Sequence, residues 1–248
     1  MLELVLDTSV GTMVGIVKDG EVLAEQTLLD GRHHAEQLAV LLERATAEAN
    51  LPAKLVEAGF DRIIVGTGPG PFTGLRAGLV TAQALGFALQ IPVLGVCTLE
   101  VLGRAGLDQA TTDARVLVVT DAKRKEVYWA LYRARGVDDV ECLREPAVTS
   151  PRRVAEFLLQ CDCQFGQCPP TGFPDRELQA VPPEPGERAT LAGSAISLVG
   201  TALGKLVEVD LQVPSVRAFS RIVSARPQGL FPVKPLYLRR PDIHQKTA

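Results

Sequence analysis

This 248-residue chain has few histidines and few aromatic residues, and it has no excess of basic charge. Only three histidines occur, and none forms the H-x3-H or H-E-x-x-H pair from which helical metal sites are built. The Gly-x-Ser-x-Gly elbow of serine hydrolases and the Walker A phosphate loop are also missing. The net charge of −3 argues against a chain that coats nucleic acid alone. If RNA is involved, we expect another subunit to supply most of the phosphate contacts.

Long apolar runs and cysteine pairs are missing as well. No apolar run approaches the roughly 18 residues of a membrane span, and no basic segment with a cleavage site opens the chain, so we expect a cytoplasmic protein with no membrane contact. The five cysteines are an odd number, as in a reduced compartment. Cys161, Cys163 and Cys168 cluster without a second pair of ligands, so we predict no metal site. The proline-rich stretch 169–188 is predicted to be a surface loop.

What is present is the composition of a globular protein, with 46 % hydrophobic and 22 % charged residues. Apolar patterning in the first half predicts the order strand, strand, strand, helix, strand, helix, strand, helix. These elements are expected at Glu3–Asp7, Met13–Val17, Glu21–Leu29, Arg32–Asn50, Asp61–Thr67, Thr73–Gln90, Pro92–Val96 and Leu99–Ala105.

A similar order restarts at Arg115, which indicates an internal duplication. Residues 107–113 are the best linker, so we expect an N-terminal domain at 1–106 and a C-terminal domain at 107–248, the last helix being free to pack back on the first domain. Two such halves predict an α/β fold of the duplicated, actin-like ATPase type, with two lobes of mixed sheet flanked by helices. The second-half elements are expected at Arg115–Thr120, Glu126–Arg133, Val140–Leu143, Pro151–Gln160, Thr190–Ala192, Ser194–Leu206, Pro214–Ala225 and Pro235–Leu238.

Two tight loops are candidates for facing a phosphate group. Asp7, Thr8 and Ser9 end the first strand, where the alternative is a turn in which side chains cap backbone amides. Gly68 and Gly70 precede a helix, so their backbone amides could hold an anion, but they could equally serve tight packing.

The helix predicted over Thr73–Gln90 has two apolar stripes and no charge after Arg76. One stripe must cover the sheet, and the second needs another cover. Gly74 and Gly78 are spaced so that another backbone could approach closely. With no poised base, nucleophile or metal pair, we predict no catalytic residues in the chain.

The string from Gly68 to Gly78 (GPGPFTGLRAG) resembles the signature GPGSFTGLRxG of the bacterial TsaB (YeaZ) family. Further segments match in order along almost the whole chain. Pro71 replaces the usual serine, which weakens the case for a phosphate in that loop. The supporting segments are Leu6–Ser9, Pro92–Glu100, Asp121–Ala130 and Pro235–Arg239.

The resemblance implies a subunit of tRNA threonylcarbamoyladenosine synthesis that is not an enzyme by itself. It implies pairing with the catalytic paralogue TsaD, which transfers a threonylcarbamoyl group to N6 of adenosine 37 in tRNAs reading ANN codons. The ATPase TsaE is a further implied partner, tRNA is reached through the complex, ATP is used by the complex with no cofactor held by this chain, and the isolated chain is expected to form a homodimer. The implied partner interface consists of Leu38, Leu41, Leu42, Ala45, Gly74, Gly78, Thr81, Leu85 and Ala88.

An actin-like small-molecule kinase is the alternative interpretation. Such a kinase needs a second phosphate loop, usually Asp-x-Gly, and the corresponding Asp121-Ala122-Lys123 lacks the glycine. A metallopeptidase is a third, less favoured hypothesis because the histidine pair is missing.

Overall fold

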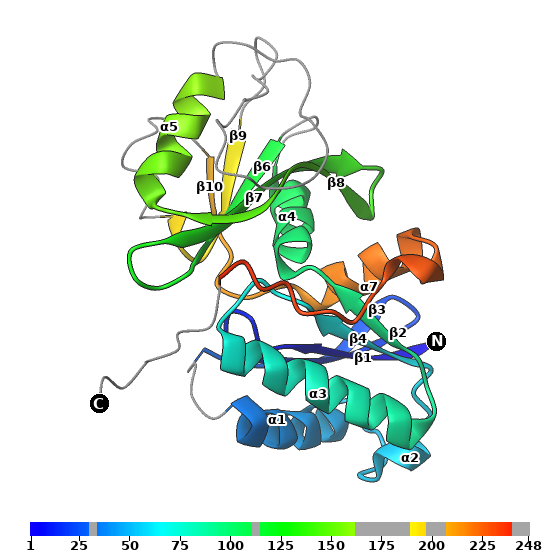
Figure 1. The fold of residues 1–248 in the computed structure, drawn as a ribbon. Helices are drawn as coiled ribbons and strands as arrows, with labels where there is room; N and C mark the ends of the chain where they lie inside the picture. Colours follow the sequence, from blue (N-terminus) through cyan, green and yellow to red (C-terminus); the bar gives the residue numbers. More distant parts are fainter. Residues whose placement is uncertain (30–33, 111–114, 162–188, 197–206, 240–248) are drawn as a thin grey trace, which may run out of the picture.

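The chain forms two five-stranded mixed sheets (Figure 1). The computed structural model describes residues 1–29, 34–110, 115–161, 189–196 and 207–239. The first sheet has the order β3-β2-β1-β4-β5 and is built from β1 (Leu2–Asp7), β2 (Thr12–Lys18), β3 (Glu21–Leu28), β4 (Arg62–Gly66) and β5 (Val93–Val96). The second has the order β10-β9-β6-β7-β8 and is built from β6 (Arg115–Asp121), β7 (Val127–Arg135), β8 (Asp139–Thr149), β9 (Ala189–Gly193) and β10 (Val207–Asp210).

The two sheets repeat one topology. In each, the first three strands form an antiparallel meander, and the fourth and fifth strands extend the first strand in parallel. The predicted duplication and the two-lobed, actin-like fold are therefore confirmed.

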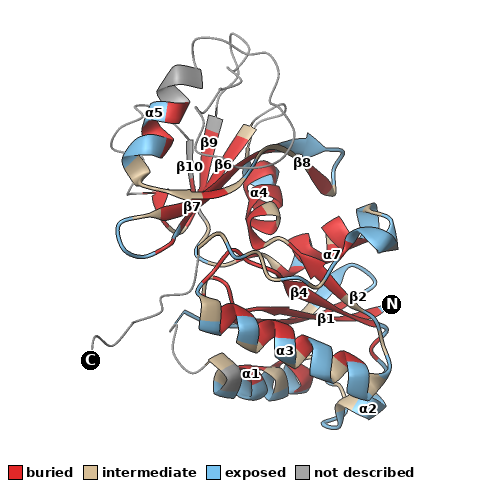
Figure 2. Ribbon diagram, viewed as in Figure 1, coloured by how far each residue is buried: buried red, intermediate tan, exposed pale blue. Residues whose placement is uncertain are grey.

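Helices cover both faces of the first sheet, which explains why its central strands are buried along their length (Figure 2). On one face lie α1 (His34–Glu48) and α3 (Phe72–Leu89), packed side by side. On the other face lies α7 (Val216–Ala225), whose Phe219 and Ile222 contact the same core as Val5 and Ile64. A short helix, α2 (Leu55–Ala58), was not predicted.

The second sheet is covered by α4 (Thr98–Gln109) on one face and α5 (Pro151–Cys161) on the other. The alternation of β6 explains this, because Val116 and Val118 face α4 while Leu117 and Val119 face α5.

The lobes exchange helices. Helix α4 follows the last strand of the first sheet but packs on the second, and α7 comes from the chain end and packs on the first. The boundary expected at residue 106 falls inside α4, which continues to Gln109. The division into domains at 1–106 and 107–248 stays a prediction.

Several predicted elements differ from those observed. Strand β8 runs over Asp139–Thr149, well beyond the predicted Val140–Leu143. Most of its residues are half-buried, polar and apolar alike, so the strand has no alternating apolar pattern that would mark its full length. Strand β10 was missed. Most of the helix predicted at Ser194–Leu206, the loop 169–188, Cys163 and Cys168 lie outside the described residues.

Helix α3 is long and apolar enough to span a membrane by length and composition alone. The prediction concerned unbroken apolar runs, and Arg76, Thr81 and Gln83 interrupt the apolar residues of this helix. Its inner residues Leu75, Leu79 and Ala82 belong to the core of the first lobe, so the apolar character of this side is explained by packing on the sheet.

Candidate functional site

Asp7 is a buried hydrogen-bond centre at the end of β1. Its carboxylate accepts hydrogen bonds from the Ser9 amide at 2.8 Å and from Thr98 Oγ1 at 2.7 Å. Burial raises the pKa of Asp7, while the hydrogen bonds from Thr98 and Ser9 act in the opposite direction. Asp7 thereby connects the loop after β1 to the first residue of α4.

The glycine-rich loop after β4 packs directly on the loop after β1. A Cβ atom on Gly70 would lie 2.8 Å from Ser9 Cα, and one on Gly66 would overlap the Asp7 carboxylate. The Gly68 carbonyl accepts a hydrogen bond from the Thr98 amide at 2.8 Å. Glycine is required here because the two loops fill the same space.

The next two glycines of the motif pack on Thr8. Thr8 Oγ1 donates a hydrogen bond to the Gly74 carbonyl at 2.8 Å. A Cβ atom on Gly78 would lie 2.3 Å from Thr8 Oγ1. The space beside these glycines is therefore filled within the lobe, by the β1–β2 loop and, at Gly74, also by the side chain of His34 at the start of α1.

This packing predicts how Gly78→Ala changes the free energy of unfolding. In the wild-type background the substitution should lower the free energy of unfolding by about 1–2 kcal/mol, because the new methyl group overpacks Thr8. In a Thr8→Ala background the same substitution should be stabilising by up to about 1 kcal/mol, because alanine favours helix over glycine. Chemical denaturation of the four proteins in this cycle measures both values. Equal costs in the two backgrounds would contradict the assigned contact.

The five candidate phosphate-facing residues thus come together, but they face protein. Asp7 and Thr8 are each 1 % exposed and Ser9 is 6 % exposed, and Gly68 and Gly70 are also buried. The alternative of side chains capping backbone amides describes this arrangement, since Ser9 and Thr98 satisfy the Asp7 carboxylate. Phosphate binding by these loops stays a prediction.

The candidate interface residues on α1 and α3 divide into inward and outward groups. Leu38, Leu41 and Ala45 belong to the buried core, as Gly74 and Gly78 do. These five therefore lie within the lobe's own core, and their contact with a partner stays a prediction. Those that reach the surface at least in part are Leu42, Thr81, Leu85 and Ala88.

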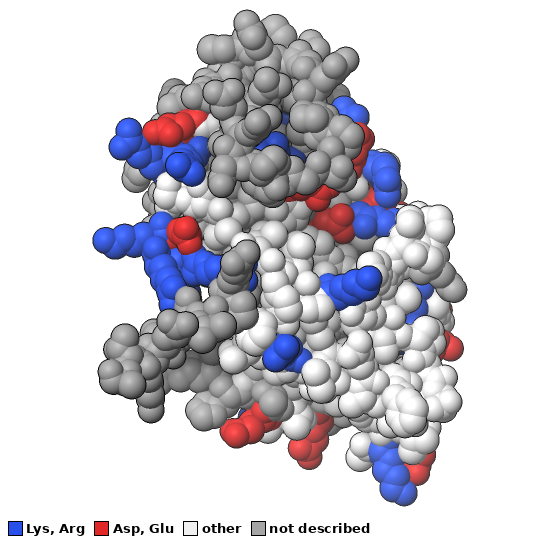
Figure 3. All heavy atoms as spheres, viewed as in Figure 1, with Lys and Arg blue, Asp and Glu red and all other residues white. Residues whose placement is uncertain are grey.

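The outward side of α3 carries an apolar surface, and of its residues only Ala88 is among the predicted interface residues. We call this surface the outer α3 face; Val80 is 62 % exposed on it and Phe87 is 80 % exposed. Figure 3 shows few charged side chains over α3, and the nearest acidic side chains lie along the lower edge of this view. The outer α3 face consists of Ala77, Val80, Ala84, Phe87 and Ala88.

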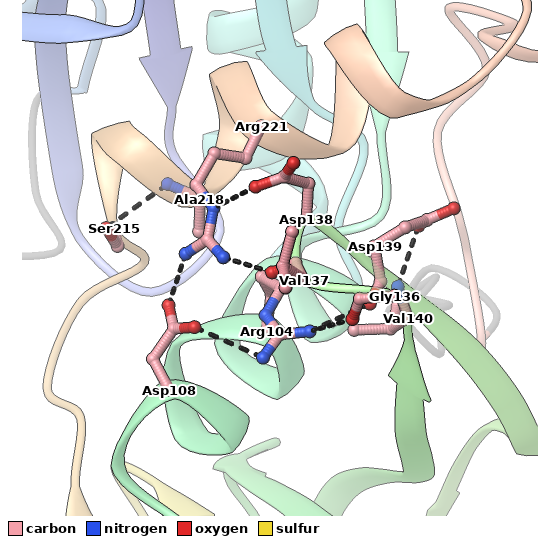
Figure 4. Close-up of polar contacts among 10 residues, drawn as sticks. All are labelled: Arg104, Asp108, Gly136, Val137, Asp138, Asp139, Val140, Ser215, Ala218 and Arg221. Carbon is pink, nitrogen blue, oxygen red and sulfur yellow. Dashed lines mark hydrogen bonds and ion pairs between the residues drawn. The ribbon is translucent and has the colours of Figure 1, made fainter.

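A network of ion pairs joins the lobes across α4, α7 and the β7–β8 turn (Figure 4). Arg221 of α7 pairs with Asp108 of α4 and with Asp138 of the turn. Arg104 of α4 donates to the Asp139 carbonyl at 2.9 Å and to Asp108 at 3.1 Å. No sequence pattern predicts these pairs, because Arg221 and Asp108 lie 113 residues apart.

Arg226 extends the network at the end of α7. Its guanidinium group donates to Glu100 at 2.9 Å and to Asp139 at 2.8 Å. Burial raises the pKa of Asp139, but hydrogen bonds from Arg226 and Arg135 outweigh burial, and its pKa lies below the usual value. Burial dominates at Glu100, whose pKa is raised although Arg226 lowers it in part. We call this network the interlobe clamp; it consists of Glu100, Arg104, Asp108, Asp138, Asp139, Arg221 and Arg226.

Among the described residues, no group of three or more His, Cys, Asp or Glu side chains lies close enough together to hold a metal ion.

Comparisons with known proteins agree with the fold and the motifs. The family model described as TsaD, tRNA N6-adenosine threonylcarbamoyltransferase, matches residues 21–180. YeaZ from Pseudomonas aeruginosa is 27 % identical with a TM-score of 0.71, covering 96 % of this chain and 99 % of that structure.

Relatives by sequence differ in the length they share with this chain. An uncharacterized protein of Mycobacterium tuberculosis is 36 % identical over 96 % of this chain and 92 % of its own length. A Mycobacterium leprae relative is also 36 % identical, but the chain spans only 56 % of it. The tRNA threonylcarbamoyladenosine biosynthesis protein TsaB of Escherichia coli is 29 % identical over 60 % of this chain and 64 % of its own length. The chain belongs to the TsaB (YeaZ) family.

Proposed function

We infer that this chain is a non-catalytic subunit of a tRNA threonylcarbamoyl transferase, which pairs with the catalytic paralogue TsaD. The complex transfers a threonylcarbamoyl group from its adenylate to N6 of adenosine 37 in tRNAs that read ANN codons. The chain acts in the cytoplasm, ATP is consumed by the complex, and this chain holds no cofactor of its own.

The outer α3 face is the observation that carries the proposal. An apolar helix surface with Val80 and Phe87 mostly exposed has no cover within the described part of the chain. Such a surface is typical of a protein–protein interface, and the neighbouring α1 provides the second helix of a docking pair. The partner is a TsaD-type paralogue, against which two helices from each subunit pack as a four-helix bundle.

The same surface accounts for the other proposed partners. In the isolated chain the outer α3 face is covered by a second copy, which forms a homodimer. In the complex TsaE and tRNA bind to the assembled subunits.

A kinase function has less support. An actin-like kinase needs a phosphate-binding gap between its loops, whereas Asp7, Thr8 and Ser9 are enclosed by glycine-rich backbone. The interlobe clamp also favours a scaffold over an enzyme that opens and closes around a nucleotide.

Reconstitution tests the proposed function. Unmodified tRNA, threonine, bicarbonate and ATP are incubated with the enzyme that makes the adenylate, TsaD, TsaE and this chain, omitting one protein at a time. We expect no modified nucleoside from this chain without TsaD, because acyl transfer needs donors that hold the carbonyl and phosphate groups. We also expect multiple-turnover activity to fall strongly when this chain alone is omitted. Modification without TsaD, or full activity without this chain, would refute the proposal.

A further inference from the structure

The turn between β6 and β7 presents three consecutive basic residues in an uncommon backbone conformation. Lys123, Arg124 and Lys125 have φ angles of 61°, 54° and 62°. Side-chain-bearing residues adopt this left-handed region mostly one at a time, so a run of three needs contacts that hold it. Such backbone concentrates at ligand sites.

Contacts around the turn provide that hold. The Asp121 carboxylate accepts a hydrogen bond from the Lys123 amide at 2.7 Å, and the Ala122 amide donates to the Glu126 carbonyl at 3.0 Å. Arg239 pairs with Glu126 and donates to the Ala122 carbonyl at 3.2 Å. The residues that flank the turn are therefore held in place, while residues 123–125 lie exposed.

The segment that carries Arg239 reaches this turn from the first lobe (Figure 1). Its Phe231 carbonyl accepts from the Gly95 amide at 3.2 Å, and its Leu236 amide donates to the Thr67 carbonyl at 2.8 Å. Residues 231–239 thus place a stretch of the first lobe's surface beside the β6–β7 turn.

That stretch is aromatic and basic. The rings of Tyr237 and Phe72 lie 4.9 Å apart, and the Arg76 guanidinium lies 4.2 Å from the centre of the Phe72 ring. Tyr237 is 38 % exposed and is two residues from Arg239. The exposed ring of Tyr237 therefore lies two residues before Arg239, the residue that contacts the basic turn.

The charge of this surface differs from that of the whole molecule. The turn and Arg239 carry four basic side chains against the acidic Asp121 and Glu126, whereas the chain has a net charge of −3. The Lys123–Asp121 ion pair is 75 % and 41 % exposed, so solvent screens it and Lys123 can exchange its partner. Figure 3 shows Lys and Arg side chains gathered on the flank where this hairpin lies.

We propose that this chain contacts RNA directly through the basic turn surface, defined as Lys123, Arg124, Lys125, Tyr237 and Arg239. Lys123 and Lys125 bind backbone phosphates, Arg239 positions the turn, and Tyr237 stacks on an unpaired base. The inference rests on the proposed function, because the RNA is the tRNA on which the complex acts.

The combination of groups favours RNA over an acidic protein. Exposed aromatic rings beside basic residues bind unpaired bases together with their phosphates, whereas an acidic peptide needs only the charge. Two lysines supply few phosphate contacts, which agrees with a chain of net charge −3 that leaves most of them to another subunit.

The test measures the dissociation constant of unmodified tRNA for the complex of this chain with TsaD, over a series of salt concentrations. Lys123→Gln with Lys125→Gln should weaken binding about tenfold and reduce the slope of log K against log salt by about 1–2. Arg152→Gln with Arg153→Gln removes the same charge from exposed positions on α5. This control should leave both quantities unchanged.

Substitutions of Tyr237 separate stacking from charge. Tyr237→Leu should weaken tRNA binding about fivefold or more without changing the salt slope, while Tyr237→Phe should retain the affinity because its ring remains.

Each contrary outcome identifies its cause. Equal effects in the two charge variants would mean a general charge effect and would overturn the inference. So would a turn variant that loses TsaD instead of tRNA, which marks a protein docking site. Wild-type tRNA affinity in a turn variant whose complex still modifies tRNA overturns the inference and leaves the proposed function intact. If no complex forms, the proposed function fails, and tRNA binding by the chain alone decides whether the two lysines matter.

Discussion

Replacing Arg226 by methionine should lower the free energy of unfolding by about 3 kcal/mol, since it leaves the partly buried Glu100 without its counter-ion and the buried Asp139 with Arg135 alone. The Arg226 side chain is 12 % exposed, and those of its partners Asp139 and Glu100 are 4 % and 20 % exposed. For a chain of this length we expect the melting temperature to fall by roughly 6–12 °C. Urea denaturation and calorimetry measure both quantities.

A surface ion pair provides the matched control. Arg152 pairs with Glu156 on α5, where the side chains are 89 % and 49 % exposed. Arg152→Met should therefore change stability by less than about 0.5 kcal/mol. If the two methionine variants cost the same, the interlobe clamp contributes nothing beyond an ordinary surface pair.

The contribution of Asp139 should depend on pH. Its pKa is lowered in the folded state from an ordinary 3.8, so its stabilising effect is present above that value. The effect is lost as the pH falls below 3.8 towards the native pKa. Over that pH range, the part of the difference in free energy of unfolding between wild type and Arg226→Met that is due to Asp139 should therefore decrease.

Aspartate on the outer α3 face should strongly weaken partner binding while leaving the chain folded. Val80→Asp and Phe87→Asp alter side chains that are 62 % and 80 % exposed in the free chain, so stability should change little. In the complex each carboxylate would be buried against an apolar helix without a counter-ion, and we expect affinity for TsaD to fall at least about 100-fold. Isothermal titration calorimetry measures this loss.

Val137→Asp is the control for that experiment. Val137 is 75 % exposed in the β7–β8 turn of the second lobe, away from α3. Its substitution adds the same charge and should leave the affinity for TsaD within about threefold of wild type, since surface changes away from an interface cost little. Undiminished binding by Val80→Asp and Phe87→Asp would place the interface on another surface.

The fold was largely predictable because both halves carry strong local patterns. The apolar run Ile63–Val65 inside β4 marks a strand covered on two sides, and α3 has an unbroken helical stripe. Strand β10 (Val207–Asp210) was missed because a four-residue strand with two acidic residues carries little periodic signal.

The candidate site was less predictable, since sequence spacing does not say which neighbour fills a gap. The spacing of Gly74 and Gly78 predicted room for another backbone, but the groups that lie closest belong to the same lobe: the side chain of His34 at Gly74 and that of Thr8 at Gly78. The basic turn surface illustrates the same difficulty. Lys123 and Tyr237 are over a hundred residues apart in sequence, and Arg239 brings their segments together through Glu126 and Ala122.

The exchange of α4 and α7 between the lobes affects how the protein unfolds. Removing α7 would uncover the face of the first sheet that holds Val5 and Ile64, and displacing α4 would uncover Val116 and Val118 on the second. Neither half can therefore lose its order without exposing apolar surface of the other. The duplication is visible in the strand order, yet unfolding should be one cooperative transition of the whole chain rather than two independent ones.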